Sequence, residues 1–101
     1  MADGYSIKIE REGGKRETLA NWLTSGWNHD WLRGLISEGK AEEYLIHGIL
    51  KIYKARAGDV IPIISNDDLL NADAGGVKRN PEAIANCAPD EILEISLNDG
   101  W

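Results

Sequence analysis

Three side chains in the sequence could act as soft or imidazole metal ligands: His29, His47 and Cys87. Their spacing matches no metal-binding motif. Structural zinc normally has four ligands, which usually occur in the sequence as pairs separated by a few residues. The sequence therefore predicts no metal ion, and no motif in it indicates a cofactor.

Cys87 is also the one cysteine that could act as a nucleophile. Such catalysis requires a neighbouring base and surroundings that lower the thiol pKa, and the residues around Cys87 suggest neither. A small buried residue at the end of a helix is the simpler interpretation. The acidic pairs Asp67-Asp68 and Asp90-Glu91 could supply acid–base groups, but adjacent acids near helix starts more often interact with the helix dipole. We therefore expect no enzyme, and a small enzyme whose site is assembled by folding stays an alternative.

The segment from Asp73 to Arg79 places Gly75 and Gly76 before Lys78 and Arg79, an order that superficially suggests a phosphate-binding loop. It lacks the longer spacing and the final Lys-Ser or Lys-Thr of a nucleotide-binding loop. These two residues are the only cations after residue 56, so local charge balance is the preferred interpretation.

Trp22, Trp27 and Trp31 lie within ten residues of each other, in a chain with four tryptophans and no phenylalanine. One interpretation is that the rings fill the core between a helix and a sheet. The other is that Trp27 and Trp31, one helical turn apart, and Trp101 stay exposed as anchors for a partner, a role in which tryptophan is enriched.

Charge is divided unevenly along the chain. Residues 1–56 contain nine Lys and Arg against eight Asp and Glu, whereas residues 57–101 contain two against nine. The net charge of −6 therefore originates in the second part, and it disfavours direct binding to nucleic acid, which depends on cationic side chains. A negative surface is often only solubilising, but it can also attract a basic partner and accelerate its association. The candidate charge contacts are Asp67, Asp68, Asp90, Glu91 and Glu94.

A chain of 101 residues has room for one hydrophobic core, so we expect a single globular domain over 1–101. Its apolar runs are far shorter than the roughly 20 residues that a membrane-spanning helix needs, and no membrane partner is expected. The first residues do not resemble a secretory signal, and a single cysteine fits a reducing compartment. Cytoplasmic localisation is therefore the expectation.

Alternating apolar residues predict strands over 5–10 and 91–97, which we expect to pair with each other. A third strand is predicted over 59–64, where Pro62 indicates a sheet edge or a bulge because it cannot donate to a strand ladder.

Helical spacing of apolar residues predicts helices over 18–25, 28–38 and 40–56. The last is the least clear, because its isoleucines also suit a strand and Gly48 costs about 1 kcal/mol in a helix interior.

Two shorter helical turns are predicted, one over 66–70 and one that begins at Asn80-Pro81, with an exposed loop over 72–80. The expected fold class is α+β, with a small antiparallel sheet of two to four strands and a single layer of two or three helices on one face.

These patterns predict a non-enzymatic acidic binding protein, such as an inhibitor of phage or mobile-element anti-defence type or an immunity-type factor. Its partner would be a basic nucleic-acid-binding protein or nuclease toxin. An alternative is a small transcription regulator that binds DNA through a helix-turn-helix formed by 28–38 and 40–56. The negative charge and the short turn at Gly39 argue against this alternative.

Overall fold

The computed structural model describes residues 2–25, 29–47, 50–70, 72 and 75–98. Six strands form one sheet: β1 (Ala2–Glu10), β2 (Arg16–Ser25), β3 (Ala41–His47), β4 (Leu50–Arg56), β5 (Lys78–Arg79) and β6 (Ile92–Asn98). They are accompanied by the α-helices α1 (Asp30–Ser37), α2 (Ala57–Ile64), α3 (Asp67–Leu70) and α4 (Pro81–Ala85), and by a short 3-10 helix, η1 (Glu12–Gly14).

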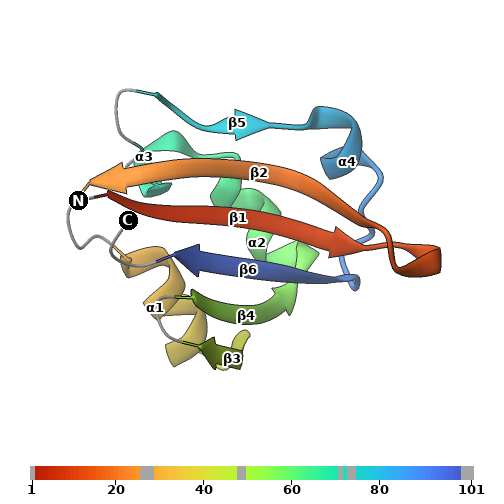
Figure 1. Cartoon of the computed structure of the whole chain (residues 1–101), viewed down its shortest axis with the longest axis horizontal. Coiled ribbons are helices and arrows are strands. Elements are labelled where there is room, and N and C mark those ends of the chain that lie inside the picture. Colours follow the sequence, from red (N-terminus) through yellow and green to blue (C-terminus); the bar gives the residue numbers. More distant parts are fainter. Residues whose placement is uncertain (1, 26–28, 48–49, 71, 73–74, 99–101) are drawn as a thin grey trace.

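Every pair of neighbouring strands in the sheet is antiparallel, in the order β3-β4-β6-β1-β2-β5 (Figure 1). The first and last strands of the chain, β1 and β6, therefore lie side by side in the middle of the sheet. This pairing confirms the predicted partnership of the segments 5–10 and 91–97. The sheet has more strands than the two to four that the sequence predicted.

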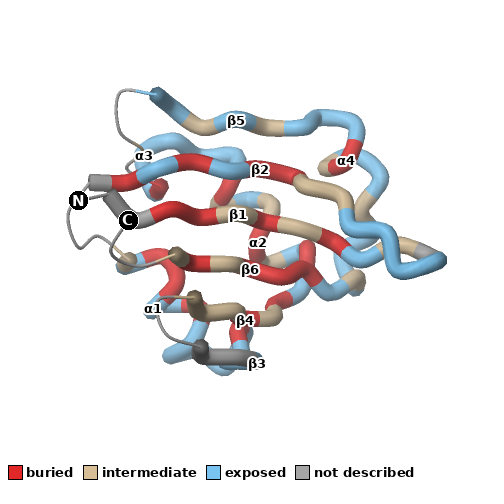
Figure 2. Tube along the Cα trace, in the orientation of Figure 1, coloured by how far each residue is buried: buried red, intermediate tan, exposed pale blue. Residues whose placement is uncertain are grey.

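Side chains alternate between the two faces of the sheet, and one face is covered by helices. Tyr5, Ile7 and Ile9 of β1, with Leu93 and Ile95 of β6, are each no more than 2% exposed and form the centre of the core. Helices α1, α2 and α3 lie behind the sheet in Figure 1, and their outer turns are exposed (Figure 2). Within the described residues no helix covers the opposite face, which we call the open face. The predicted α+β class is thus confirmed.

The predicted helix over 28–38 corresponds to α1. It ends as expected at Gly39, whose φ of 75° is readily adopted only by glycine. The Lys40 N–H donates to the Leu35 carbonyl at 2.8 Å and closes the end of the helix. Asn28, the expected N-cap, lies outside the described residues.

The two shorter helical turns also form where the sequence predicted them, as α3 and α4. At the start of α4 the Asn80 side chain accepts a hydrogen bond from the Ala83 N–H at 3.2 Å, and Pro81 occupies the first helical position. No helix in the described part of the chain is long and apolar enough to cross a membrane.

The predicted helix over 18–25 is wrong, because this segment belongs to β2. Leu19, Trp22 and Leu23 have helical spacing, but Leu23 lies on the open face and is 41% exposed. The buried side of the strand consists of Ala20, Trp22 and Thr24, two residues apart. Leu19 is buried because it is the extra residue where the register with β1 shifts. Pairing with β1 thus overrides a local helical pattern.

The predicted helix over 40–56 is also wrong, because β3 and β4 form an antiparallel pair there. Tyr53 and Ala55 of β4 are buried on the core side, and Ile52 and Lys54 alternate with them toward the open face. Gly48, which counted against a helix, is outside the described residues. The helix-turn-helix of the alternative function does not form, since its second helix is a pair of strands.

The predicted strand over 59–64 is the third correction, because residues 57–64 form α2. An unbroken apolar run does not distinguish a buried strand from a buried helix by its period. Ala57, Val60 and Ile64 are completely buried at helical spacing. Pro62 lies inside the helix on its exposed side, where it removes only the intrahelical bond to the Gly58 carbonyl in the first turn.

Candidate binding surfaces

The two aspartates of α3 are exposed in its first turn. Asp67 forms an ion pair with Arg79 of β5, and the Arg79 guanidinium also donates to the Ile64 carbonyl at 2.7 Å. Arg79 thus supplies the local charge balance expected of the loop cations. The Asp68 backbone N–H donates to the Asn66 side chain at 3.1 Å. Asp68 is exposed, and among the described residues no cation pairs with its carboxylate.

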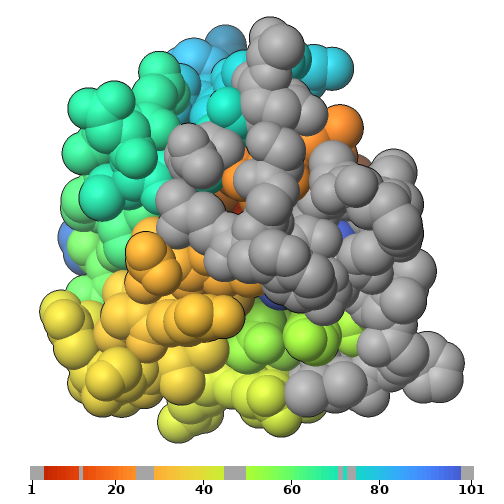
Figure 3. All heavy atoms as spheres, turned by 90° about the vertical axis from the view of Figure 1, so that its left-hand side faces the viewer, coloured from red at the N-terminus to blue at the C-terminus, as the bar shows by residue number. Residues whose placement is uncertain are grey.

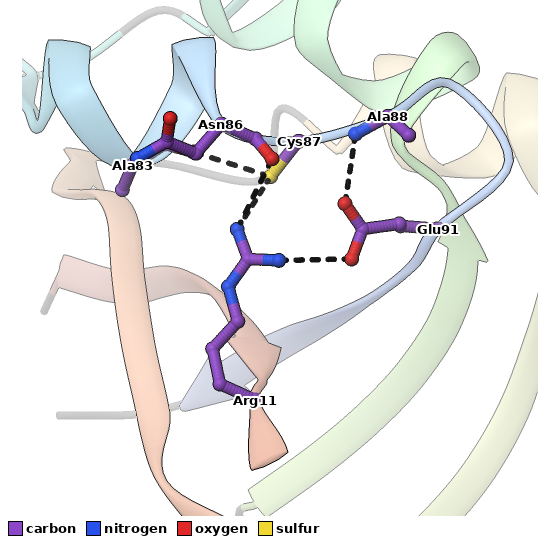
Figure 4. Close-up of polar contacts among 6 residues, drawn as sticks. All are labelled: Arg11, Ala83, Asn86, Cys87, Ala88 and Glu91. Atoms are coloured by element: carbon purple, nitrogen blue, oxygen red, sulfur yellow. Dashed lines mark hydrogen bonds and ion pairs between the residues drawn. The ribbon is translucent and has the colours of Figure 1, made fainter.

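Asp90 and Glu91 lie in the turn that precedes β6. Glu91 accepts hydrogen bonds from the Ala88 backbone N–H at 2.8 Å and from the Arg11 guanidinium at 2.9 Å (Figure 4). The bond from Ala88 lowers the pKa of Glu91, and the positive charge of Arg11 lowers it further. Glu91 therefore anchors the turn, whereas Asp90 beside it is exposed.

Glu94 lies on the open face in the middle of the sheet and is only 8% exposed. The strand register places Lys8 of β1 and Lys54 of β4 directly opposite it on either side. Arg16 of β2 approaches it to 3.6 Å. The charge of Glu94 is thus balanced within the protein, and of the five predicted acidic contacts it is the least accessible.

The predicted acidic contacts do not form one cluster, because α3 and the turn before β6 lie at opposite ends of the sheet (Figure 1). The structure instead separates charge by face. The four α-helices, which we call the helix layer, contain one arginine, Arg33, and five carboxylates, all in first turns: Asp30, Asp59, Asp67, Asp68 and Glu82. In the end-on view of Figure 3, α1, α2 and α3 form the left-hand side of the molecule.

The open face has the opposite balance. Residues directly opposite each other in neighbouring strands share a face, so the register assigns each charged residue to one side of the sheet. By this criterion the open face carries five cations, Lys8, Arg16, Lys54, Arg56 and Lys78, and three carboxylates, Glu10, Glu42 and Glu94. Over the described residues the helix layer is therefore net negative and the open face net positive.

The tryptophans that the structure describes belong to the core. Trp22 and Trp31 are 3% and 7% exposed, and their ring centroids lie 5.2 and 5.0 Å from that of Tyr5. Among the described residues neither indole N–H meets a hydrogen-bond acceptor, so ring packing holds this cluster together. Trp31, a predicted anchor, is covered. Trp27 and Trp101, the other two, lie outside the described residues.

Cys87 follows α4 and is half-buried. Its thiol donates to the Ala83 carbonyl at 3.3 Å, and an Arg11 nitrogen lies 3.9 Å from the sulfur (Figure 4). Burial raises the pKa of the Cys87 thiol, and the charge of Arg11 opposes this rise only in part. The thiol is therefore a weaker nucleophile near neutral pH than an ordinary cysteine, because the thiolate is the reactive form.

Metal ligands do not converge in the part of the chain that the structure describes, where no group of three or more His, Cys, Asp and Glu could hold an ion. The His29 ring is hydrogen-bonded through Nδ1 to the Tyr5 hydroxyl at the edge of the aromatic cluster. The side chain of His47 lies outside the described residues.

A groove of about 630 Å³ crosses the open face, and sequence reasoning did not find it. Its floor lies on the two central strands, where the register brings together the small residues Gly4 and Ser6 of β1 and Ser96 of β6. The flanking strands supply larger side chains as walls: Leu50 and Ile52 on β4, and Asn21 and Leu23 on β2. Because the small residues of the central strands lie between the larger side chains of β2 and β4, the surface of the sheet is concave there.

The groove is also lined by Lys8, Arg16 and Lys78, and its lining includes no carboxylate among the described residues. A signal for this site does exist in the sequence, since Gly4, Ser6 and Lys8 are the residues that alternate with the apolar side chains of β1. Their meaning depends on which strands flank β1, and the sequence pattern does not supply that information.

No protein-family model matches the chain, and no curated protein or solved structure is significantly similar to it.

Proposed function

We propose that this protein is a non-enzymatic binding protein whose acidic helix layer engages a basic macromolecular partner, as an inhibitor or immunity-type factor of a nucleic-acid-binding protein or nuclease would. The observation that supports this proposal is the separation of charge by face, with five carboxylates and one arginine on the four α-helices. A surface of one sign attracts an oppositely charged protein over a Debye length of about 8 Å at physiological salt. Such attraction accelerates association and excludes partners of like charge.

Exposure and ion pairing distinguish the carboxylates that are available to a partner. Asp68, Glu82 and Asp90 are exposed, and among the described residues none of them has a cation within ion-pair distance. Asp67 and Glu91 instead form ion pairs with arginines that hold their own segments in place. We therefore assign partner binding to Asp68, Glu82 and Asp90.

The turn that carries Asp90 belongs to the same acidic side, because it is bonded to the start of α2. The Ala57 N–H donates to the Glu91 carbonyl at 2.8 Å, and the Gly58 N–H donates to the Pro89 carbonyl at 2.9 Å. These bonds hold Asp90 close to the first turn of α2, where Asp59 lies.

The test is a triple charge reversal, Asp68→Lys with Glu82→Lys and Asp90→Lys. Proteins retained from a lysate by the immobilised wild-type chain at low salt are identified, and the affinity of each purified candidate is then measured for both chains. The reversed chain should bind a genuine partner at least about tenfold more weakly, which corresponds to about 1.4 kcal/mol. The affinity of the wild-type chain should fall as salt is added.

A matched control for the pair Asp68→Lys with Glu82→Lys reverses two exposed acids of the open face, Glu10 and Glu42. It changes the net charge by the same amount, so a loss of binding in both variants would indicate a non-specific effect of total charge. Equal affinity of the partner for the wild-type and Asp68/Glu82/Asp90 chains, both folded by circular dichroism, would refute the proposal.

A further inference from the structure

We propose that the groove on the open face is a second, separate binding site, and that it takes a small amphiphilic anion, that is, an acid group attached to an apolar body. This inference does not depend on the proposed function, because it concerns the opposite face of the sheet. Its volume of about 630 Å³ lies within the range of roughly 300–1,000 Å³ that is typical of small-molecule sites.

The charge of the groove selects an anion. Lys8, Arg16 and Lys78 line it; Arg16 lies within ion-pair distance of Glu94, and Lys8 lies opposite Glu94 in the register without an ion pair among the described residues. The protein as a whole has a net charge of −6, so a positive groove runs against the overall balance. Ammonium and guanidinium groups around a concavity are the donors that bind carboxylate, sulfonate or phosphate groups.

The polarity of the groove changes along the strands, which orients the ligand. Three rows of residues run across the sheet, each made of residues paired in register. The first row is Leu50-Asn98-Gly4-Leu23, the second is Ile52-Ser96-Ser6-Asn21, and the third is Lys54-Glu94-Lys8-Thr18. The side chains therefore pass from apolar walls, through neutral hydrogen-bonding groups, to charged groups.

The distance between the first and third rows sets the length of the ligand. Gly4 and Lys8 are four residues apart on one strand, which corresponds to about 13 Å at 3.3 Å per residue. The acid group would lie near Lys8, with Lys78 in the neighbouring second row and Arg16 one row beyond Lys8, and the apolar body would extend toward Gly4 between Leu23 and Leu50. Ser6 and Ser96 between them offer hydroxyl groups to polar atoms of the ligand.

The test uses two fluorescent probes that have the same rings and differ only in an acid group: anilinonaphthalene sulfonate and its uncharged analogue, phenylnaphthylamine. Titration of the folded protein should give one site per chain, with the dissociation constant of the sulfonate at least about tenfold lower than that of the analogue. The affinity for the sulfonate should fall with added salt, and that for the analogue should not.

Two sets of variants separate the contributions to binding. Lys8→Gln with Lys78→Gln should raise the dissociation constant of the sulfonate about tenfold and leave that of the analogue unchanged. Lys40→Gln, an exposed lysine away from the groove, should change neither. Ser6→Leu should weaken both probes, because the added side chain fills the floor.

Amide chemical shifts locate the probe, and they should change in β1, β2 and β6 and not in the helices. The proposal would be overturned by equal affinity for the two probes, by equal effects of the Lys40 and Lys8/Lys78 substitutions, or by shifts confined to the helix layer. Displacement of the sulfonate by a short single-stranded oligonucleotide that binds more tightly would also overturn it, since the face would then recognise nucleic acid. The Lys8/Lys78 variant keeps the helix-layer carboxylates, so its binding to a basic partner tests the proposed function separately.

Discussion

Two glycines in helices should respond in opposite ways to the same substitution by alanine. Gly34 lies in the interior of α1, and a methyl group added there would meet nothing within 4 Å. Gly58 lies in the first turn of α2, and a methyl group there would lie 3.2 Å from both Cβ and the carbonyl oxygen of Pro89. The Pro89 oxygen is also the acceptor of the Gly58 N–H bond, at 2.9 Å. The added methyl group would therefore crowd the same carbonyl oxygen that accepts the hydrogen bond from the Gly58 N–H.

The magnitudes follow from these contacts. Gly34→Ala should stabilise the protein by about 0.5–1 kcal/mol, because alanine loses less conformational entropy than glycine when a helix forms. At Gly58 this gain is offset by a packing cost of about 1–3 kcal/mol, since Pro89 is held by the short turn that leads into β6. We expect Gly58→Ala to destabilise the protein by about 1–2 kcal/mol.

The measurement is urea unfolding followed by circular dichroism, with thermal melts as a second readout. A difference of about 2 kcal/mol between the two variants should separate their melting temperatures by roughly 8–16 °C in a domain of this size. Finding Gly58→Ala as stable as wild type would show that the turn before β6 does not pack tightly on α2. The position of Asp90 beside the first turn of α2 would then lose its structural support.

Three further outcomes are expected from the polar contacts. Asn80→Ala should lower the free energy of unfolding by about 1 kcal/mol, because α4 loses its N-cap. The control substitution Asn21→Ala, at an exposed position of β2, should leave this free energy unchanged. Glu91→Gln should lower the free energy of unfolding at neutral pH. The pKa of Glu91 is lowered in the folded protein. Its contribution to stability is therefore complete above the unfolded pKa of about 4.3 and is lost as the pH falls through the folded pKa. The free energies of unfolding of the wild-type and Glu91→Gln chains should therefore become equal in acid. Because the pKa of Cys87 is raised, alkylation by iodoacetamide should reach half its maximal rate above about pH 8.5, and Arg11→Gln should move this midpoint higher; a lower midpoint would contradict the assigned role of the guanidinium.

The elements that sequence reasoning predicted correctly are those whose signals are local. The alternation in β1 and β6 reports one buried face directly. The start of α4 is determined by Asn80 and Pro81, and the end of α1 by Gly39, and each of these signals acts within a few residues.

The errors arise where pairing between distant strands decides the structure. Leu19, Trp22 and Leu23 satisfy a helical period, yet β1 takes Trp22 into the core and leaves Leu23 on the open face. Residues 40–56 satisfy it as well, but the edge of β6 is available only after the chain has folded back over more than thirty residues. The free energy that such pairing contributes cannot be predicted from a local sequence pattern.

The binding surfaces were harder to predict for the same reason. The sequence shows an acidic second part, and folding divides its described carboxylates among α2, α3, α4, the turn before β6 and the interior of the open face. Glu94 illustrates this, because its neighbours Lys8 and Lys54 come from strands far away in sequence. The groove depends on the pairing of Ser6 with Ser96, ninety positions apart, which no pattern in either strand implies.

The alternation that forms the core also gives the sheet a second surface of different charge. Odd positions of β1 supply Tyr5, Ile7 and Ile9 to the core beneath the acidic helices, so the even positions Gly4, Ser6 and Lys8 must face the other way. A substitution at an even position can therefore change the open face while the core and the helix layer stay intact. For this reason the two proposed sites can be tested independently in a chain of only 101 residues, and the loss of one binding activity should leave the other unchanged.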